Sequence, residues 1–208
     1  MDKLLNLTEF QLDSLREVGN IGVGNAATAL SKLIGKSIKI VVPETKFILI
    51  TEFSNEFGGP DKKVCATYLK ITGDLNGESM LLFSEEDALG FAELLLGKPK
   101  GSIKEIDKMG KSALMEMSNI FAGAYLNALS NLLGMAVLPS IPQMTVDMVQ
   151  AVLDFILAQT STYANKILAV KTKINIEEVD VLGEFVMFFE VESYQKILKG
   201  LVDKFSLN

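Results

Sequence analysis

The strongest constraint on the fold of this chain is an internal repeat. A shift of 99 positions aligns residues 13–43 with residues 112–142, and 11 of the 31 aligned positions are identical. Most of the shared residues are apolar or glycine, as two copies of one packing scheme require. A length of 208 residues suits one domain of ordinary size. We therefore expect a single domain over residues 1–208, built from two repeats at about 8–99 and 107–208.

Hydrophobic periodicity predicts a similar order of elements in each half. In the first half we expect a helix at 8–35, with Thr8 as its N-cap and Gly35 at its end, and then two strands separated by Pro43, at 38–42 and 47–50. A loop at 53–63, two strands at 64–71 and 78–83 and a helix at 85–96 follow. In the second half the ranges are 106–133 (helix), 135–138 (strand), 146–157 (helix), 167–174 and 185–191 (strands) and 193–205 (helix). The helix at 146–157 has no clear equal in the first half. Two rounds of helices and strands predict an α/β domain.

Two polar positions are common to both copies of the repeat: Glu17 with Asn20, and Glu116 with Asn119. Residues three apart on a helix share one face, so each pair points in one direction. Duplication of a core does not require polar side chains at matching places. The pairs therefore indicate a functional surface, which one turn earlier also carries Asp13 and Ser112.

Composition excludes several classes of chemistry at this surface. The chain has no histidine and one cysteine, Cys65. This rules out Ser-His-Asp and Cys-His catalysis, Cys-x-x-Cys redox chemistry and the standard zinc sites. We expect Cys65 to be a small core residue, because no base is available to activate its thiol.

Charge and hydropathy limit the partners and the location. The formal net charge is −6 and the sequence has no run rich in lysine or arginine, which argues against nucleic acid and anionic membranes as partners. No stretch has the roughly 18 uncharged apolar residues of a membrane span, and the N-terminus lacks the features of a signal peptide. We expect a cytoplasmic protein that does not insert into membranes.

Glutamate and asparagine suit a particular kind of chemistry. A glutamate can pair with a lysine or arginine of another protein, and an asparagine can hold and orient water although it has no titratable proton. Positioning of this kind is most of what phosphoryl transfer needs. The surface is therefore suited to hydrolysis of a phosphoryl group that a second protein holds, with any metal ion belonging to that protein.

The spacing of these residues resembles a known signature. The pattern [Asp/Ser]-x3-Glu-x2-Asn-x22-Pro occurs twice, as Asp13, Glu17, Asn20 and Pro43, and as Ser112, Glu116, Asn119 and Pro142. It resembles the signature of the CheC/CheX/FliY family of chemotaxis phosphatases. Two copies are typical of the CheC branch, since CheX-type proteins keep one site. FliY-type proteins add a CheY-binding motif and a flagellar-switch domain, for which we expect no room in this chain.

The resemblance implies a fold and a mechanism. The family fold is a pseudo-twofold α/β domain whose two signature helices are exposed beside a β-sheet. The substrate would be the aspartyl phosphate of the response regulator CheY, with magnesium in CheY and no cofactor or metal in this chain. Glu17 and Glu116 would pair with the regulator's lysine, and Asn20 and Asn119 would orient the attacking water. The remaining positions would support the surface (Asp13, Ser112) or shape the backbone beyond the helix (Pro43, Pro142).

A second partner also follows from the resemblance. CheC-type proteins bind CheD, a receptor glutamine deamidase, through the helix that has no first-half counterpart. Here that helix would span residues 144–156, with Asp147 at the acidic position. The alternative to an enzyme is a non-catalytic adaptor that binds CheD, CheY or both.

Two other patterns have simpler explanations. Gly22, Gly24 and Ala27 match a dinucleotide-binding fingerprint, with Glu44 at a suitable distance, but a charged helical segment stands where a buried strand is required. Tight helix packing explains these glycines better. An acidic cluster suggests a hard-metal site, but most of it falls in an expected turn at 178–183, so a solvated hairpin is favoured; its members are Glu177, Glu178, Asp180 and Glu184.

Overall fold

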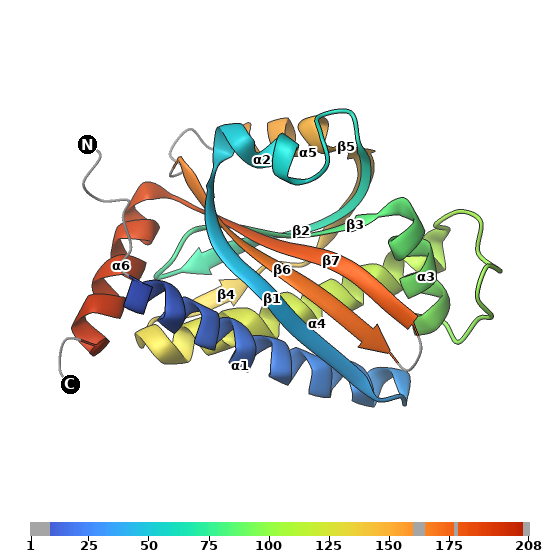
Figure 1. Ribbon diagram of the computed structural model, residues 1–208, viewed down its shortest axis with the longest axis horizontal. Coiled ribbons are helices and arrows are strands. Elements are labelled where there is room, and N and C mark those ends of the chain that lie inside the picture. The colour runs from blue at the N-terminus through green and yellow to red at the C-terminus, as the bar shows by residue number, and fades with distance from the viewer. Residues whose placement is uncertain (1–8, 160–164, 177–178, 206–208) are drawn as a thin grey trace.

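A computed structural model describes residues 9–159, 165–176 and 179–205 in three layers (Figure 1). The middle layer is a β-sheet. One of its faces carries the longer helices, which are α1 (Glu9–Ile34), α3 (Glu85–Leu95), α4 (Lys108–Leu133) and α6 (Val191–Phe205). The other face carries α2 (Phe53–Glu56) and α5 (Val149–Leu157). The α/β class expected from the sequence is confirmed.

Both signature helices, α1 and α4, end where local chemistry predicts, and α4 also begins at a capping residue. The Asp107 side chain accepts a hydrogen bond from the Gly110 N–H at 2.8 Å and so caps the start of α4. Gly35 and Gly134 follow the two helices with φ of 72° and 66°, a left-handed conformation that favours glycine. The expected N-cap, Thr8, lies outside the described residues.

Within the described residues, seven strands form one antiparallel sheet. They are β1 (Ile38–Leu49), β2 (Lys63–Gly73), β3 (Gly77–Ser84), β4 (Val137–Pro139), β5 (Gln143–Met148), β6 (Lys166–Ile176) and β7 (Val179–Phe189). The order is β1-β6-β7-β3-β2-β4, and β5 also pairs with β2. The first strand of each half thus pairs with the hairpin of the other half. Neither half can complete its part of the sheet alone.

The structure of β1 differs from the prediction of two strands at 38–42 and 47–50. Pro43 does not separate two strands, because β1 runs without a break from Ile38 to Leu49. The pairing with β6 shifts register between Val41 and Glu44, around the proline. A proline lacks the N–H that a ladder needs, and it is tolerated in a strand at the edge of a sheet and at an irregularity. β1 meets both conditions.

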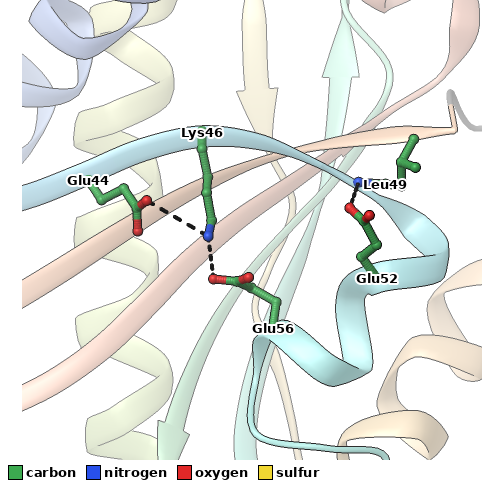
Figure 2. Close-up of polar contacts among 5 residues, drawn as sticks. All are labelled: Glu44, Lys46, Leu49, Glu52 and Glu56. Carbon is green, nitrogen blue, oxygen red and sulfur yellow. Dashed lines mark hydrogen bonds and ion pairs between the residues drawn. The ribbon is translucent and has the colours of Figure 1, made fainter.

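The expected loop at 53–63 contains a helix. A 3-10 turn (Ile50–Glu52) leads into α2, and the Glu52 carboxylate accepts from the Leu49 N–H at 3.2 Å. Figure 2 shows this contact and the ion pair from Lys46 of β1 to Glu56 of α2. Phe53 is fully buried. Apolar burial and these contacts therefore order a segment whose glycine and proline content predicted a loop.

The expected helix, placed at 146–157 by periodicity and at 144–156 by the resemblance, is wrong in its first part. Residues Gln143–Met148 form β5, and the helix α5 begins only at Val149. Asp147 therefore lies in a strand, opposite Val64 of β2. The short helix α2 follows β1 as α5 follows β5, and the two helices contact each other. The second-half helix thus has a small positional counterpart.

The last hairpin also differs from the expectation. β7 begins at Val179, so Asp180 and Glu184 lie within a strand and not in a turn at 178–183. Asp180 is paired with Asn175, and Glu184 with Lys171 of β6. Glu177 and Glu178 lie outside the described residues. The solvated turn was therefore placed too far along the chain.

Side chains along each strand point alternately to the two faces of the sheet, so the core consists of two clusters. The larger cluster lies between the sheet and the four long helices, and it includes Leu69, Phe83, Phe121 and Phe185. The smaller lies under α2 and α5. Cys65, with no exposed surface, belongs to the larger cluster, as expected for a core residue.

Candidate functional site

The two signature helices lie side by side on the outer side of the molecule and run in opposite directions (Figure 1). In α1, Leu15 and Val18 are buried, whereas Glu17 and Asn20 are exposed. In α4, Leu114 and Met117 are buried, Glu116 is exposed and Asn119 is half-buried. Helical periodicity thus directs each Glu-Asn pair away from the core, as the sequence indicated.

The first pair lies on an open helix surface. Asp13 is exposed one turn before Glu17, and its carboxylate accepts from the Arg16 guanidinium at 2.9 Å. An exposed ion pair of this kind stabilises a protein by less than about 1 kcal/mol. Pro43 lies in β1, and its side chain is outside the described set. The structure therefore gathers Asp13, Glu17 and Asn20 on one helix face.

The second pair lies in a shallow hollow of about 350 Å³. All four signature residues of the second copy line it: Ser112, Glu116, Asn119 and Pro142. Its other wall is formed by Pro139 at the end of β4 and by Ser140 and Ile141, which follow before β5. The hollow thus combines a carboxylate and a carboxamide with an apolar wall.

The two copies differ in the segment after the helix: β1 continues through a register shift between Val41 and Glu44, whereas residues 140–142 separate β4 from β5. Residues 40–43 belong to β1, whereas the aligned residues 139–142 end β4 and lead by a short break into β5. Ile141 protrudes at this break with 85% of its surface exposed. Ile141 was not predicted from the sequence as a site residue, although its place between Pro139 and Pro142 was a usable signal.

A buried contact fixes α4 beneath the hollow. The hydroxyl groups of Ser118 and Thr67 are 2.6 Å apart, and both residues are buried. Ser118 lies between Glu116 and Asn119 in the chain but faces the sheet. This contact joins α4 to β2 and so helps to set the rotation of the helix.

The two Glu-Asn pairs form separate sites. The helices are in close contact at Gly22 and Tyr125, where a Cβ atom added to the glycine would lie 2.8 Å from the tyrosine Cα. Glu17 precedes Gly22 by five residues and Glu116 precedes Tyr125 by nine. Because the helices run in opposite directions, the 14 helical steps add up to about 20 Å along the axes. One phosphoryl group cannot contact both pairs.

The surface around Asp147 is on the other side of the sheet from the signature helices. The Asp147 carboxylate accepts from the Met148 N–H at 2.8 Å. On the same side of the sheet, 44% of Phe155 in α5 is accessible. The Phe155 ring packs on Tyr68 of β2, with centroids 5.1 Å apart.

The hollow contains no activated nucleophile of its own. Its polar side chains are serine, glutamate and asparagine, without a histidine or cysteine. Burial raises the pKa of Cys65 to about 12, and this thiol lies in the core. Among the described residues, no group of three or more Cys, Asp and Glu side chains is arranged to hold a metal ion. The arrangement suits binding and orientation more than covalent catalysis.

The helices in the described part of the chain are too short or too polar to span a membrane.

Comparison with known proteins supports the resemblance seen in the residues. The sequence model of the CheC-like family matches residues 10–46, which contain the first signature. The chain is 34% identical over 199 residues to the Bacillus subtilis (strain 168) protein named CheY-P phosphatase CheC, which covers 94% of this chain and 95% of that protein. It is 29% identical over 126 residues to the flagellar motor switch phosphatase FliY of the same organism, covering 60% of this chain and 32% of that protein.

Solved structures confirm the fold. Thermotoga maritima FliY superimposes with a TM-score of 0.75 at 24% identity, and the match covers 96% of this chain and all of that one. The FliM middle domain from H. pylori gives a TM-score of 0.67 at 14% identity, covering 93% and 99%. Because these sequence identities are low, the two structures show the similarity of the fold alone. With 34% identity over nearly the whole length of a CheC protein, this chain belongs to the CheC-like family.

Proposed function

We propose that this protein is a phosphatase that hydrolyses the aspartyl phosphate of phosphorylated CheY. The observation that carries the proposal is the position of Glu116 and Asn119, which line one hollow on the exposed side of α4 together with Ser112 and Pro142. The 34% identical relative is named a CheY-P phosphatase. In the first copy, Glu17 and Asn20 form a second exposed pair.

Each side chain has a distinct role in this proposal. Glu116 and Glu17 pair with a lysine beside the phosphoryl group of CheY and so align the two proteins. Asn119 and Asn20 hold a water molecule in line with the bond between phosphorus and the aspartate oxygen. The water oxygen forms a new bond to phosphorus, the bond to the aspartate oxygen breaks, and aspartate carboxylate and inorganic phosphate are released.

The metal ion required by this chemistry would belong to CheY. Magnesium neutralises charge on the transferred phosphoryl group. The residues of the hollow offer a single carboxylate, from Glu116, which is a poor set of ligands for a resident magnesium ion. We therefore propose that this chain contributes orientation and docking, without a cofactor of its own.

The decay of phosphorylated CheY in the presence of magnesium tests the proposal. We expect the protein to accelerate decay, and we expect the Asn20→Ala, Asn119→Ala double variant to lose about 100-fold in rate because the water is no longer positioned. A Glu→Lys change at position 17 or 116 should instead weaken binding to CheY at that site. Binding is measured with CheY carrying beryllofluoride, a stable phosphoryl mimic.

The adaptor alternative makes a different prediction in the same experiment. A binding module would retain CheY without accelerating decay, and the asparagine changes would then weaken binding as much as the glutamate changes do. Loss of hydrolysis with nearly unchanged binding in the asparagine double variant separates the enzyme from the adaptor.

We further propose that CheD binds the surface formed by β5 and α5. The support is an exposed carboxylate in β5, Asp147, and a partly exposed aromatic side chain in α5, Phe155, on the same side of the sheet. An apolar centre with a charged neighbour is typical of a protein interface. The Asp147→Lys, Phe155→Ser double variant should bind CheD at least about ten-fold more weakly by calorimetry. Unchanged CheD affinity in this variant would exclude the surface.

A further inference from the structure

The segment at residues 139–142 presents an unusually exposed apolar side chain at the rim of the second hollow. Ile141 is 85% exposed, more than any other large apolar side chain that the structure describes. It lines the same hollow as Glu116 and Asn119. Transfer of an isoleucine side chain out of water lowers the free energy, so a partner that covers Ile141 would be bound more tightly.

The backbone of this segment is fixed in place by β2. The Ser140 N–H donates to the Lys70 carbonyl at 2.8 Å, and the Lys70 N–H donates to the Ser140 hydroxyl oxygen at 3.0 Å. Pro139 and Pro142 flank the exposed residue and restrict the backbone further. Ile141 is therefore held out to solvent by a rigid support, and little conformational entropy remains to be lost when a partner covers it.

The first copy of the repeat shows that the fold does not require this exposure. The residue aligned with Ile141 is Val42, which is half-buried in β1 and packs against the larger core cluster. The same sequence position is thus part of the core in one half and a protruding side chain in the other. This difference follows from the break between β4 and β5, not from the signature itself.

We propose that Ile141 is an apolar anchor for the receiver surface of phosphorylated CheY at the α4 site. This proposal rests on the proposed function. The occupant follows from continuity, because Ile141, Glu116 and Asn119 line one hollow and a protein paired with Glu116 must also cover Ile141. At the aligned position beside the α1 site, Val42 packs against the core and does not protrude as Ile141 does. CheY therefore binds the α4 site more tightly than the α1 site.

The test uses the full-length protein with the α1 site silenced by Glu17→Lys and Asn20→Ala. In this background, Ile141→Ser should raise KM for phosphorylated CheY, and Kd for beryllofluoride-CheY, by about ten-fold, with kcat at saturation nearly unchanged. Ile141→Leu should restore both values. Leu138→Ser is the matched control, because Leu138 is 61% exposed in β4 but does not line the hollow.

The outcomes separate the anchor from the catalytic proposal. Unchanged KM and Kd in Ile141→Ser, or an equal loss in Leu138→Ser, overturns the anchor. If the wild-type protein binds CheY without accelerating decay, the proposed phosphatase activity is overturned. A ten-fold rise in Kd for Ile141→Ser would then still support the anchor. If the wild-type protein does not bind CheY at all, both proposals are overturned. Circular dichroism of each variant checks that the fold is intact.

Discussion

Gly22 of α1 lies directly against the backbone of Tyr125 in α4. A Cβ atom at Gly22 would be 2.8 Å from the Tyr125 Cα, closer than side chains approach a backbone atom. This contact lets the two signature helices pack at short range and sets how their exposed faces are presented. Gly24, by contrast, has open space around it, and a Cβ atom added there would have no neighbour within 4 Å. Tight packing therefore explains Gly22 but not Gly24.

The two glycines should respond in opposite ways to alanine. Gly22→Ala forces the helices apart and is expected to cost about 1–3 kcal/mol of unfolding free energy. Gly24→Ala should stabilise the protein by about 0.5–1 kcal/mol, because alanine is the better helix former and the site is open. Urea denaturation of both variants measures the difference. Equal effects at the two positions would contradict the close contact.

The buried hydroxyl pair beneath the hollow should contribute measurably to stability. We expect Ser118→Ala and Thr67→Val to be coupled by about 1 kcal/mol in a double-mutant cycle, since each hydroxyl is the partner of the other. The cycle is measured by chemical denaturation. If the two changes are additive, the hydrogen bond does not contribute to stability.

Glu93 should stabilise the protein at neutral pH and lose this effect in acid. Its carboxylate accepts from the Ile103 N–H at 2.7 Å and the Gly101 N–H at 2.8 Å. The hydrogen bond from Ile103 lowers the pKa of Glu93 and outweighs the opposing effect of burial. A carboxyl group with a lowered folded-state pKa contributes stability above its unfolded pKa and loses it as pH falls through the folded value.

Glu93→Gln should therefore be destabilising by about 1–3 kcal/mol at pH 7. The difference from the wild type should shrink as the pH falls from the unfolded pKa of about 4.3 through the lowered folded pKa, where the wild-type carboxylate becomes protonated. Denaturation at both pH values measures this. A destabilisation that does not vary with pH would mean that the charge of Glu93 has no role.

Glu78 should show the opposite dependence on pH. Only 3% of its surface is exposed, and one carboxylate oxygen has no hydrogen-bond partner. Burial raises the pKa of Glu78, and Lys70 opposes this only in part. With a raised folded-state pKa, the folded protein binds the proton more tightly, so stability falls as pH rises from the unfolded value through the folded one. Thermal melting of Glu78→Gln should match the wild type near pH 4 and exceed it at pH 8, and a variant less stable than the wild type at pH 8 would refute this.

Cys65 should be inert in the folded protein. Its side chain has no exposed surface, and burial raises the pKa of its thiol to about 12. The reactive thiolate is therefore absent near pH 8. A thiol reagent such as Ellman's should label the protein only after denaturant is added. Rapid labelling under native conditions would place the thiol outside the core.

The extent to which sequence predicted the fold depended on the range of the interactions. The ends of α1 and α4 were predictable at Gly35 and Gly134, because a left-handed glycine ends a helix through its own backbone. The outward direction of the Glu-Asn pairs was also predictable, since helical periodicity depends on neighbours three and four residues away. These features require no knowledge of the rest of the chain.

Strand boundaries were less predictable because they depend on distant partners. β1 continues through Pro43 because β6, more than 120 residues later, pairs with it on both sides of the proline. Asp147 lies in a strand because β5 pairs with β2 from Lys63 to Tyr68. Local propensity around Asp147 favoured a helix, and the long-range ladder was stronger.

The sequence alone determined the repeat, the helices that carry it and the two polar pairs. These features can be recognised from local periodicity and from the identical residues in the two halves. Only the tertiary structure decided that the two sites differ. The strand after α1 is continuous, whereas the strand after α4 breaks at residues 139–142 and exposes Ile141 beside Glu116 and Asn119. Hydrogen bonds between Ser140 and Lys70, 70 residues apart, hold this segment against β2, and such long-range contacts cannot be read from local periodicity.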